Sequence, residues 1–199
     1  MRAITCYFSP QSGYAYLGHD RLCRIAADHG AVIHWRPVDI MKVFTESGTT
    51  PPAKQSRARL TYRRADMARW AEALNLPLNP APRYWPVQTV AACKMIIAAE
   101  RLGGAVATFI AAVHHAVWAG EENIADSGTL LRIAGECGFD TNALAAVAYM
   151  PEVAETAESH TAEAVAAGVF GSPSYVVGGE LFWGQDRLDF VAARLKEMA

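Results

Sequence analysis

Patterns typical of β-strands occur only near the two ends of this 199-residue chain. A first strand is predicted at residues 3–8 and a second at residues 31–40, with a helical pattern from Tyr14 to about Gly30 between them. A β-α-β unit with one short crossover favours parallel pairing in a sheet that is covered by helices. Pro37 has no backbone N–H for a sheet ladder, so we expect the second strand to lie at an edge or to end there.

Strand signals return only close to the carboxyl end of the chain. Residues 174–177 and 180–183 flank the pair Gly178-Gly179, which is a signature of a two-residue hairpin turn. A closing helix is expected to begin at about Asp186.

The long middle of the chain shows helical periodicity and no convincing strand. The order of elements therefore predicts an α/β fold, a thioredoxin-like mixed sheet with a large all-helical insertion. The sheet domain would comprise residues 1–40 and 169–199, and the inserted helical domain residues 41–168. Within the insertion, helices are predicted at residues 62–74, 89–102 and 106–118, from a cap at Ser127 to Gly138, and from Thr141 and Pro151 onward.

Composition restricts the partners of the chain. The 18 basic and 20 acidic residues are spread through the sequence and give a formal charge of −2, so we predict no nucleic-acid partner. The amino terminus lacks the apolar stretch of a signal peptide, and no apolar run approaches the length of a membrane span. We therefore expect a soluble cytoplasmic protein with no membrane partner.

Neither the cysteines nor the histidines form a metal or redox motif. Cys6, Cys23, Cys93 and Cys137 include no C-x-x-C pair, which argues against a zinc ribbon, a dithiol redox centre or a disulfide framework. The six histidines offer no H-E-x-x-H spacing. We expect reduced, mostly buried cysteines and no metal site.

The first strand meets the first helix at the sequence Ser-Pro-Gln-Ser-Gly, residues 9–13. Such a junction in an open α/β sheet presents backbone N–H groups that favour an anion and lower the pKa of a thiol. Ser9 and Ser12 each have two interpretations, an ordinary helix cap or a hydroxyl that donates to a bound anion. In the predicted fold this turn faces the loop at Ser172-Pro173, for which we predict a cis peptide bond.

The segment YFSPQSGYAYLG resembles the strand-turn-helix of the glutathione-dependent 2-hydroxychromene-2-carboxylate isomerases and kappa-class glutathione transferases. In that family a motif of F-x-x-x-S-P, an aromatic residue, Ser or Ala, and Y-L carries the active serine. A gap-free match from Tyr16-Leu17 places this serine at Ser12. The rival, Ser9, matches the Ser-Pro dipeptide literally but requires a three-residue insertion.

The resemblance extends over nearly the whole chain. Its most specific part is GVFGSPSYVVGGELFWGQDRL, in which G-x-F-G-x-P is followed by F-W-G-x-D-R. Two positions depart from the family pattern. Gly13 replaces the proline after the serine, which loosens the turn, and Thr49 replaces an asparagine that some relatives have near glutathione.

The resemblance implies a thioredoxin fold with a helical insertion and the activity of a glutathione-dependent cis-trans isomerase. The family converts 2-hydroxychromene-2-carboxylate into trans-o-hydroxybenzylidenepyruvate in naphthalene breakdown. The glutathione thiolate adds to the conjugated carbon, the new single bond rotates, and elimination leaves the trans alkene. Ser12 would donate to the sulfur and keep it ionised.

The resemblance also implies residues for the two ligands, glutathione and a small aromatic substrate. Of the basic residues Lys54, Arg57 and Arg59, which enter the insertion, we prefer Arg59 for the substrate carboxylate. The predicted glutathione-binding residues are Ser12, Thr49, Arg59, Ser172, Pro173, Gln185 and Asp186. Aromatic candidates for a wall against the substrate ring are Tyr84, Trp85 and Trp183.

Three alternatives stay open at this point. A kappa-like transferase would use the same thiolate but release an adduct with another electrophile. A glutathione-binding protein without catalysis is the second, and Gly13 is its only hint. Thiol-disulfide exchange is disfavoured because no cysteine lies in the turn. The sequence does not decide between a monomer and a homodimer.

Overall fold

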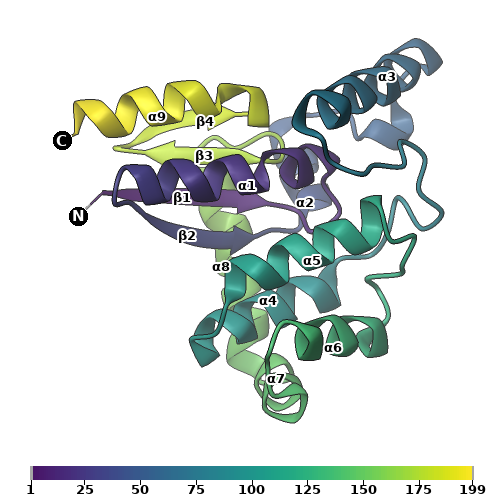
Figure 1. The fold of residues 1–199 in the computed structure, drawn as a ribbon, viewed down its shortest axis with the longest axis vertical. Coiled ribbons are helices and arrows are strands. Elements are labelled where there is room, and N and C mark those ends of the chain that lie inside the picture. The colour runs from purple at the N-terminus through teal and green to yellow at the C-terminus, as the bar shows by residue number, and fades with distance from the viewer. Residues whose placement is uncertain (1, 199) are drawn as a thin grey trace.

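The computed structural model describes residues 2–198 and contains one four-stranded sheet (Figure 1). The strands are β1 (Ala3–Phe8), β2 (Val32–Pro37), β3 (Ser174–Val177) and β4 (Glu180–Trp183). They lie in the order β2-β1-β3-β4, with β2 parallel to β1, and with β3 and β4 each antiparallel to the preceding neighbour. The mixed sheet is therefore built from the two ends of the chain, and the predicted thioredoxin-like fold class is confirmed.

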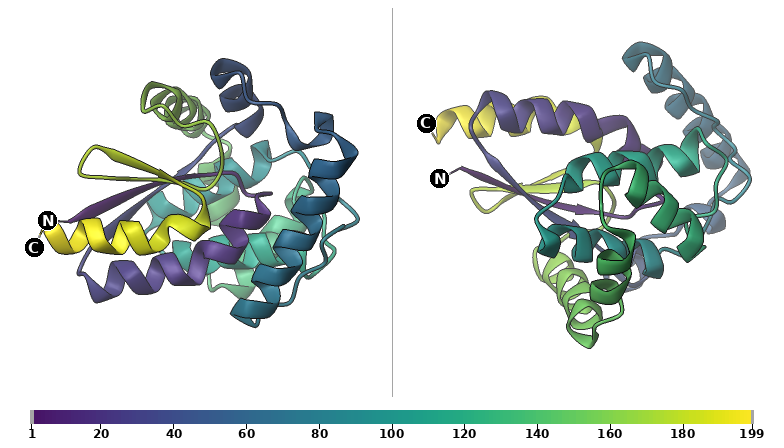
Figure 2. Two further views of the ribbon diagram at one scale, coloured as in Figure 1. Left: turned by 90° about the horizontal axis from the view of Figure 1, so that it is seen from above. Right: turned by 60° about the horizontal axis from the view of Figure 1, so that its bottom comes forward.

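Helices connect and cover this sheet. Seen from above, α1 and α9 lie side by side on one side of the sheet and α8 lies on the other (Figure 2). Their bounds are α1 Gly13–Asp28, α2 Ile40–Ser47, α3 Arg57–Leu74, α4 Val90–Leu102, α5 Val106–Trp118, α6 Ser127–Glu136, α7 Thr141–Ala148, α8 Pro151–Ala166 and α9 Leu188–Glu197. Single 3-10 turns lie at Pro52–Lys54 and Gln185–Arg187. Within residues 2–198 no helix is both long and apolar enough to cross a membrane.

Several element boundaries differ from the sequence prediction. The helix predicted at residues 62–74 already begins at Arg57. The second strand ends at Pro37 rather than near Ile40, because Asp39 caps a helix, α2, that the sequence analysis missed. The Asp39 carboxylate accepts hydrogen bonds from two backbone N–H groups in the first turn of α2. Asp126, not Ser127, caps α6 by accepting from the Thr129 N–H. The closing helix begins at Leu188, after a 3-10 turn.

The side chains of β1 alternate between two cores. Ile4, Cys6 and Phe8 belong to the main core, which continues into the helices of the middle of the chain through side chains such as Trp118. Tyr7 points to the opposite face and packs in a smaller core with α2 and α8. The main core thus includes residues from both sequence segments, and the division into two domains stays a prediction.

Two histidines lie inside the main core, close to the first turn. His114 on α5 is 1% exposed, and its ring contacts the rings of Phe8 and His19 with centroids 5.7 and 6.0 Å apart. Neither ring nitrogen of His114 has a hydrogen-bond partner among residues 2–198. Burial lowers the pKa of His114 to about 3, and also lowers the pKa of His19. Both imidazoles are therefore neutral in the native protein near neutral pH.

The four cysteines are free thiols. Burial is the main cause that raises the pKa of each one, to about 11 for Cys23 and about 12 for Cys93. A thiol with a raised pKa stays protonated at neutral pH, so none of the four is prepared to act as a nucleophile.

Candidate active site

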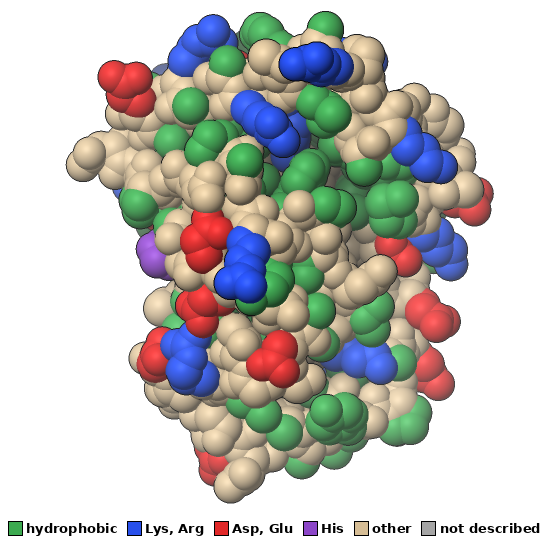
Figure 3. Space-filling view, turned by 90° about the vertical axis from the view of Figure 1, so that its right-hand side faces the viewer, with side chains coloured by type: hydrophobic (Ala, Val, Ile, Leu, Met, Phe, Trp, Pro, Cys, Tyr) green, Lys and Arg blue, Asp and Glu red, His purple; other side chains and the backbone are tan. Residues whose placement is uncertain are grey.

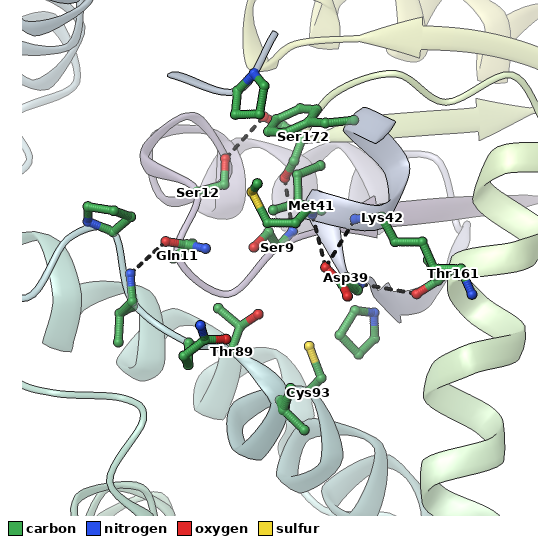
Figure 4. Close-up of a pocket in the computed structure, with 18 of the residues that line it drawn as sticks. Ser9, Gln11, Ser12, Asp39, Met41, Lys42, Thr89, Cys93, Thr161 and Ser172 are labelled. Atoms are coloured by element: carbon green, nitrogen blue, oxygen red, sulfur yellow. Dashed lines mark hydrogen bonds between the residues drawn. The ribbon is translucent and has the colours of Figure 1, made fainter. Parts of the chain in front are cut away.

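The two turns singled out in the sequence meet at one end of the sheet (Figure 4). The Ser12 hydroxyl donates to the Ser172 carbonyl over 3.0 Å, and the Ser9 N–H donates to the Ser172 hydroxyl over 2.9 Å. The Ser172–Pro173 peptide bond is cis, as predicted. The predicted pairing of these turns in space is therefore present, with Ser172 in contact with both serines.

The structure assigns different positions to the two candidate serines. Ser12 is the N-cap of α1, because its hydroxyl oxygen accepts from the Ala15 N–H over 3.2 Å. Ser9 does not cap the helix. It is 1% exposed, and its hydroxyl has no hydrogen-bond partner among residues 2–198. Only Ser12 combines partial exposure with a place at the positive end of the α1 dipole.

Ser12 lies on the wall of a cleft of about 820 Å³. The cleft is bordered by the turn before α1, by α2, by the segment that precedes α4, and by α8 (Figure 4). A cleft of this volume is in the range of small-molecule sites, about 300–1,000 Å³, and is large enough for more than one small ligand. Ser12 and Ser172 therefore face a space that can hold a thiol compound together with a second molecule.

The charged residues of the cleft are mostly basic. Lys42, Lys54, Arg63 and Lys94 contribute to its lining, against the carboxylates of Asp39 and Glu158. Figure 3 shows mainly basic side chains at the top of the molecule, where α3 lies. Four basic groups against two carboxylates leave an excess of positive charge in the cleft, which favours an anionic ligand.

The structure brings only some of the predicted site residues into this cleft. Ser9, Ser12, Ser172, Trp85 and Lys54 line it. The others lie elsewhere. Pro173 is buried next to Ser172, Thr49 donates to the Phe170 carbonyl, and Trp183 packs on the Phe170 ring. Arg57 and Arg59 are exposed at the start of α3, and the Arg83 guanidinium covers the Tyr84 ring. The buried Gln185 accepts from Arg21, and Asp186 pairs with Arg187 at the surface. Their predicted roles in ligand binding stay predictions.

The sequence analysis missed most polar residues of the cleft, and two of them, Gln11 and Arg63, matter most for its architecture. The side-chain amide oxygen of Gln11, Oε1, accepts from the Val87 N–H over 2.9 Å, which fixes the segment before α4 against the serine turn. Arg63 lies one helical turn beyond Arg59 on α3 and lines the cleft. The cluster of arginines in α3 was the signal that could have indicated Arg63.

Gly13, which replaces the family proline, is tightly surrounded. A Cβ atom at this position would lie 2.2 Å from the Met67 Cε and 3.0 Å from Trp118. We expect Gly13→Ala to lower the free energy of unfolding by about 1–3 kcal/mol, because a well-packed core must move to admit the methyl group. Met67→Leu removes the atom that collides, so the double variant should be more stable than the sum of the single changes predicts. Urea unfolding of the four proteins tests this, and strict additivity would contradict it.

The sheet order, the polar turn before α1 and the facing cis-proline turn before β3 define a thioredoxin-fold protein with a helical insertion and a serine at the start of α1. The sequence model of the DSBA-like thioredoxin domain matches residues 3–196, and the chain belongs to this family.

Curated relatives of similar length carry one name. The chain is 28% identical to a 2-hydroxychromene-2-carboxylate isomerase of Sphingobium xenophagum, over 98% of each chain. It is 29% identical to a protein of the same name from Pseudomonas putida, over 93% of this chain and 90% of the relative. A solved structure of a 2-hydroxychromene-2-carboxylate isomerase matches with a TM-score of 0.82 and 23% identity, covering 98% of this chain and 95% of the other.

Proposed function

We propose that this protein is a glutathione-dependent isomerase that converts 2-hydroxychromene-2-carboxylate into trans-o-hydroxybenzylidenepyruvate in aromatic catabolism. The observation that carries the proposal is the Ser12 hydroxyl at the amino end of α1, opposite Ser172 and on the wall of the cleft. The names of the curated relatives support the same activity.

The reaction needs a thiolate that the protein itself does not supply. Rotation about the conjugated double bond requires reversible addition of a nucleophile that also leaves well, which a thiolate does. The thiols of this chain have raised pKa values, and no cysteine lies in the turn at residues 9–13. The sulfur must therefore come from a ligand, and glutathione is the thiol that the family resemblance indicates.

Ser12 is suited to ionise a thiol placed beside it. A hydrogen bond to the anion and the positive end of the α1 dipole both favour the thiolate over the thiol. In the structure the Ser12 proton is directed to the Ser172 carbonyl. In the proposed complex the cysteinyl N–H of glutathione donates to that carbonyl in strand fashion, and the Ser12 hydroxyl turns to the sulfur. Binding of the peptide and activation of the thiol would then be coupled.

The first expected result is binding of reduced glutathione. Isothermal calorimetry at millimolar glutathione should show heat of binding. The bound thiol should show thiolate absorbance at pH values below about 8.5, the usual pKa of a thiol. S-methylglutathione is the matched control, because it keeps the peptide contacts but has no ionisable thiol; it should bind and support no turnover. Absence of binding to folded protein would refute the proposal. A stable substrate–glutathione adduct, detected by mass spectrometry, would indicate a transferase instead.

A further inference from the structure

The Arg63 guanidinium lies against two aromatic rings, that of Trp85, which lines the cleft, and that of Tyr14 in the first turn of α1. Its central carbon is 5.0 Å from the centroid of the Tyr14 ring and 5.3 Å from that of Trp85. Such contacts attract the cation to the ring faces and fix its plane. The Tyr14 hydroxyl donates to Asp66 over 2.9 Å, which in turn holds the tyrosine ring in place.

Arg63 lacks the anionic partner that a half-buried arginine usually has. Among residues 2–198, no carboxylate lies within ion-pair distance of Arg63, and no hydrogen bond satisfies its N–H groups, whereas Arg21 pairs with Asp189 and Arg132 with two glutamates. Burial lowers the pKa of Arg63 from its ordinary value, against the opposing effects of Tyr14 and Asp66, yet a guanidinium stays protonated in proteins. The Arg63 guanidinium is charged, half-buried and on the wall of the cleft, and its N–H donors have no acceptor. Such a group is suited to bind an anionic ligand.

The supports of Arg63 connect it to the serine turn. Tyr14 follows Ser12 by two residues in the first turn of α1. Trp85 precedes Val87, whose N–H donates to Gln11 in the same turn as Ser12. A group bound by Arg63 would therefore be held in a fixed position relative to the turn that carries the Ser12 hydroxyl.

We propose that Arg63 binds the carboxylate of the substrate, and that the site therefore selects conjugated ketones that carry an acid group over neutral ones. This inference rests on the proposed isomerase function. A planar guanidinium binds a carboxylate through two parallel N–H···O bonds, which fixes both the position and the orientation of the acid. When the carboxylate is bound in this way, the conjugated carbon of the substrate is held in a fixed position relative to the thiolate.

The test compares an acid substrate with its neutral form. Isomerisation of trans-o-hydroxybenzylidenepyruvate and of its methyl ester is followed with excess glutathione in the reverse direction. Arg63→Met, which keeps an unbranched side chain between the rings, should lower kcat/KM for the acid on the order of 10- to 100-fold. The ester should change by less than about threefold, because it offers no full charge to the guanidinium. Arg63→Lys should restore part of the loss by restoring the charge.

Two controls accompany these variants. Arg64→Met, at the exposed neighbouring position on α3 and outside the cleft lining, should leave both substrates unchanged. The pH titration of bound glutathione should be the same in Arg63→Met and wild type, since Arg63 is proposed to hold the substrate and not the thiol. Thermal unfolding tests whether each variant is folded. If Arg63→Met is unfolded, the comparison of acid and ester is made with Arg63→Lys instead.

The outcomes separate this inference from the proposed function. Equal losses on acid and ester, or no loss on either, would overturn the role of Arg63 while the isomerase remains. If the wild type isomerises neither compound, the proposed function fails, and calorimetric binding of trans-o-hydroxybenzylidenepyruvate decides the role of Arg63. Binding that is lost in Arg63→Met and kept in Arg64→Met supports it, and any other pattern, including no binding to wild type, overturns it.

Discussion

Ser12→Ala should lower the rate of isomerisation on the order of 10²-fold, which is the usual cost of removing one oriented donor to an anion. Glutathione affinity should stay nearly constant, because most of its contacts would be to the peptide backbone and the carboxylates. Without the hydroxyl the pKa of the bound thiol rises, so the thiolate fraction at neutral pH falls and the rate profile shifts to higher pH. Turnover and thiolate absorbance measured as functions of pH give both quantities.

The role of Ser12 as a helix cap calls for a stability control. Losing its hydrogen bond to the Ala15 N–H should cost about 1 kcal/mol in the free energy of unfolding. Asp126→Ala removes the cap of α6, which lies outside the cleft, and should cost a similar amount without slowing the reaction. A rate as low in Asp126→Ala as in Ser12→Ala would show that the loss reflects stability alone.

Ser9→Ala distinguishes the two candidate serines. The sequence left open that Ser9 caps the helix, but its hydroxyl is buried without a partner, so its removal should leave both stability and the thiolate signal almost unchanged. If Ser9→Ala abolishes the signal and Ser12→Ala keeps it, the gap-free match at Ser12 is wrong.

Lowering the pH should destabilise the protein already at pH values well above those at which its carboxylates become protonated. His114 has a pKa of about 3 in the folded chain and a reference value of 6.5, so below pH 6.5 only the unfolded chain gains the proton. The stabilisation is therefore complete above pH 6.5 and is lost as the pH falls towards 3, by up to about 1.4 kcal/mol per pH unit. His19 and His160, whose pKa values burial also lowers, act in the same direction.

His114→Leu should make the acid limb of stability shallower. The substitution removes an imidazole whose two nitrogens have no partner among residues 2–198 and replaces it with an apolar group of similar size. Urea unfolding between about pH 7 and pH 4 measures the slope, which linkage ties to proton uptake. His115→Leu, at the exposed neighbouring position, is the matched control and should keep the wild-type slope. Parallel curves for His114→Leu and wild type would refute the assignment.

The sequence predicted the sheet and the meeting of the two serine turns because these depend on local patterns. Strand alternation, the glycine pair of the hairpin and the Ser-Pro turn are each contained in a few residues. The helix α2 was missed because its cap, Asp39, directly follows a strand that ends in Pro37. Pro37 and Asp39 were local marks of the change, but the alternation before them led the sequence analysis to assign residues 31–40 to one strand.

The walls of the cleft were harder to predict than its chemical centre. Arg59 and Arg63 are four residues apart on α3, so helical periodicity places them on a similar face. Which of the two reaches the cleft depends on how far α3 extends past the turn before α1, and that is set by long-range packing. For the same reason the sequence could not indicate that Gln185 turns inward to Arg21.

The pairing of β1 with β3 has a consequence for synthesis of the chain. As the polypeptide leaves the ribosome, β1 can pair with β2 early. The opposite edge of β1, which pairs with β3, stays unpaired until almost the entire chain has emerged. An unpaired central strand is a template for association with other chains. Nascent protein stalled before residue 174 should therefore depend on chaperones that shield this edge, whereas a chain released after the hairpin of β3 and β4 should not.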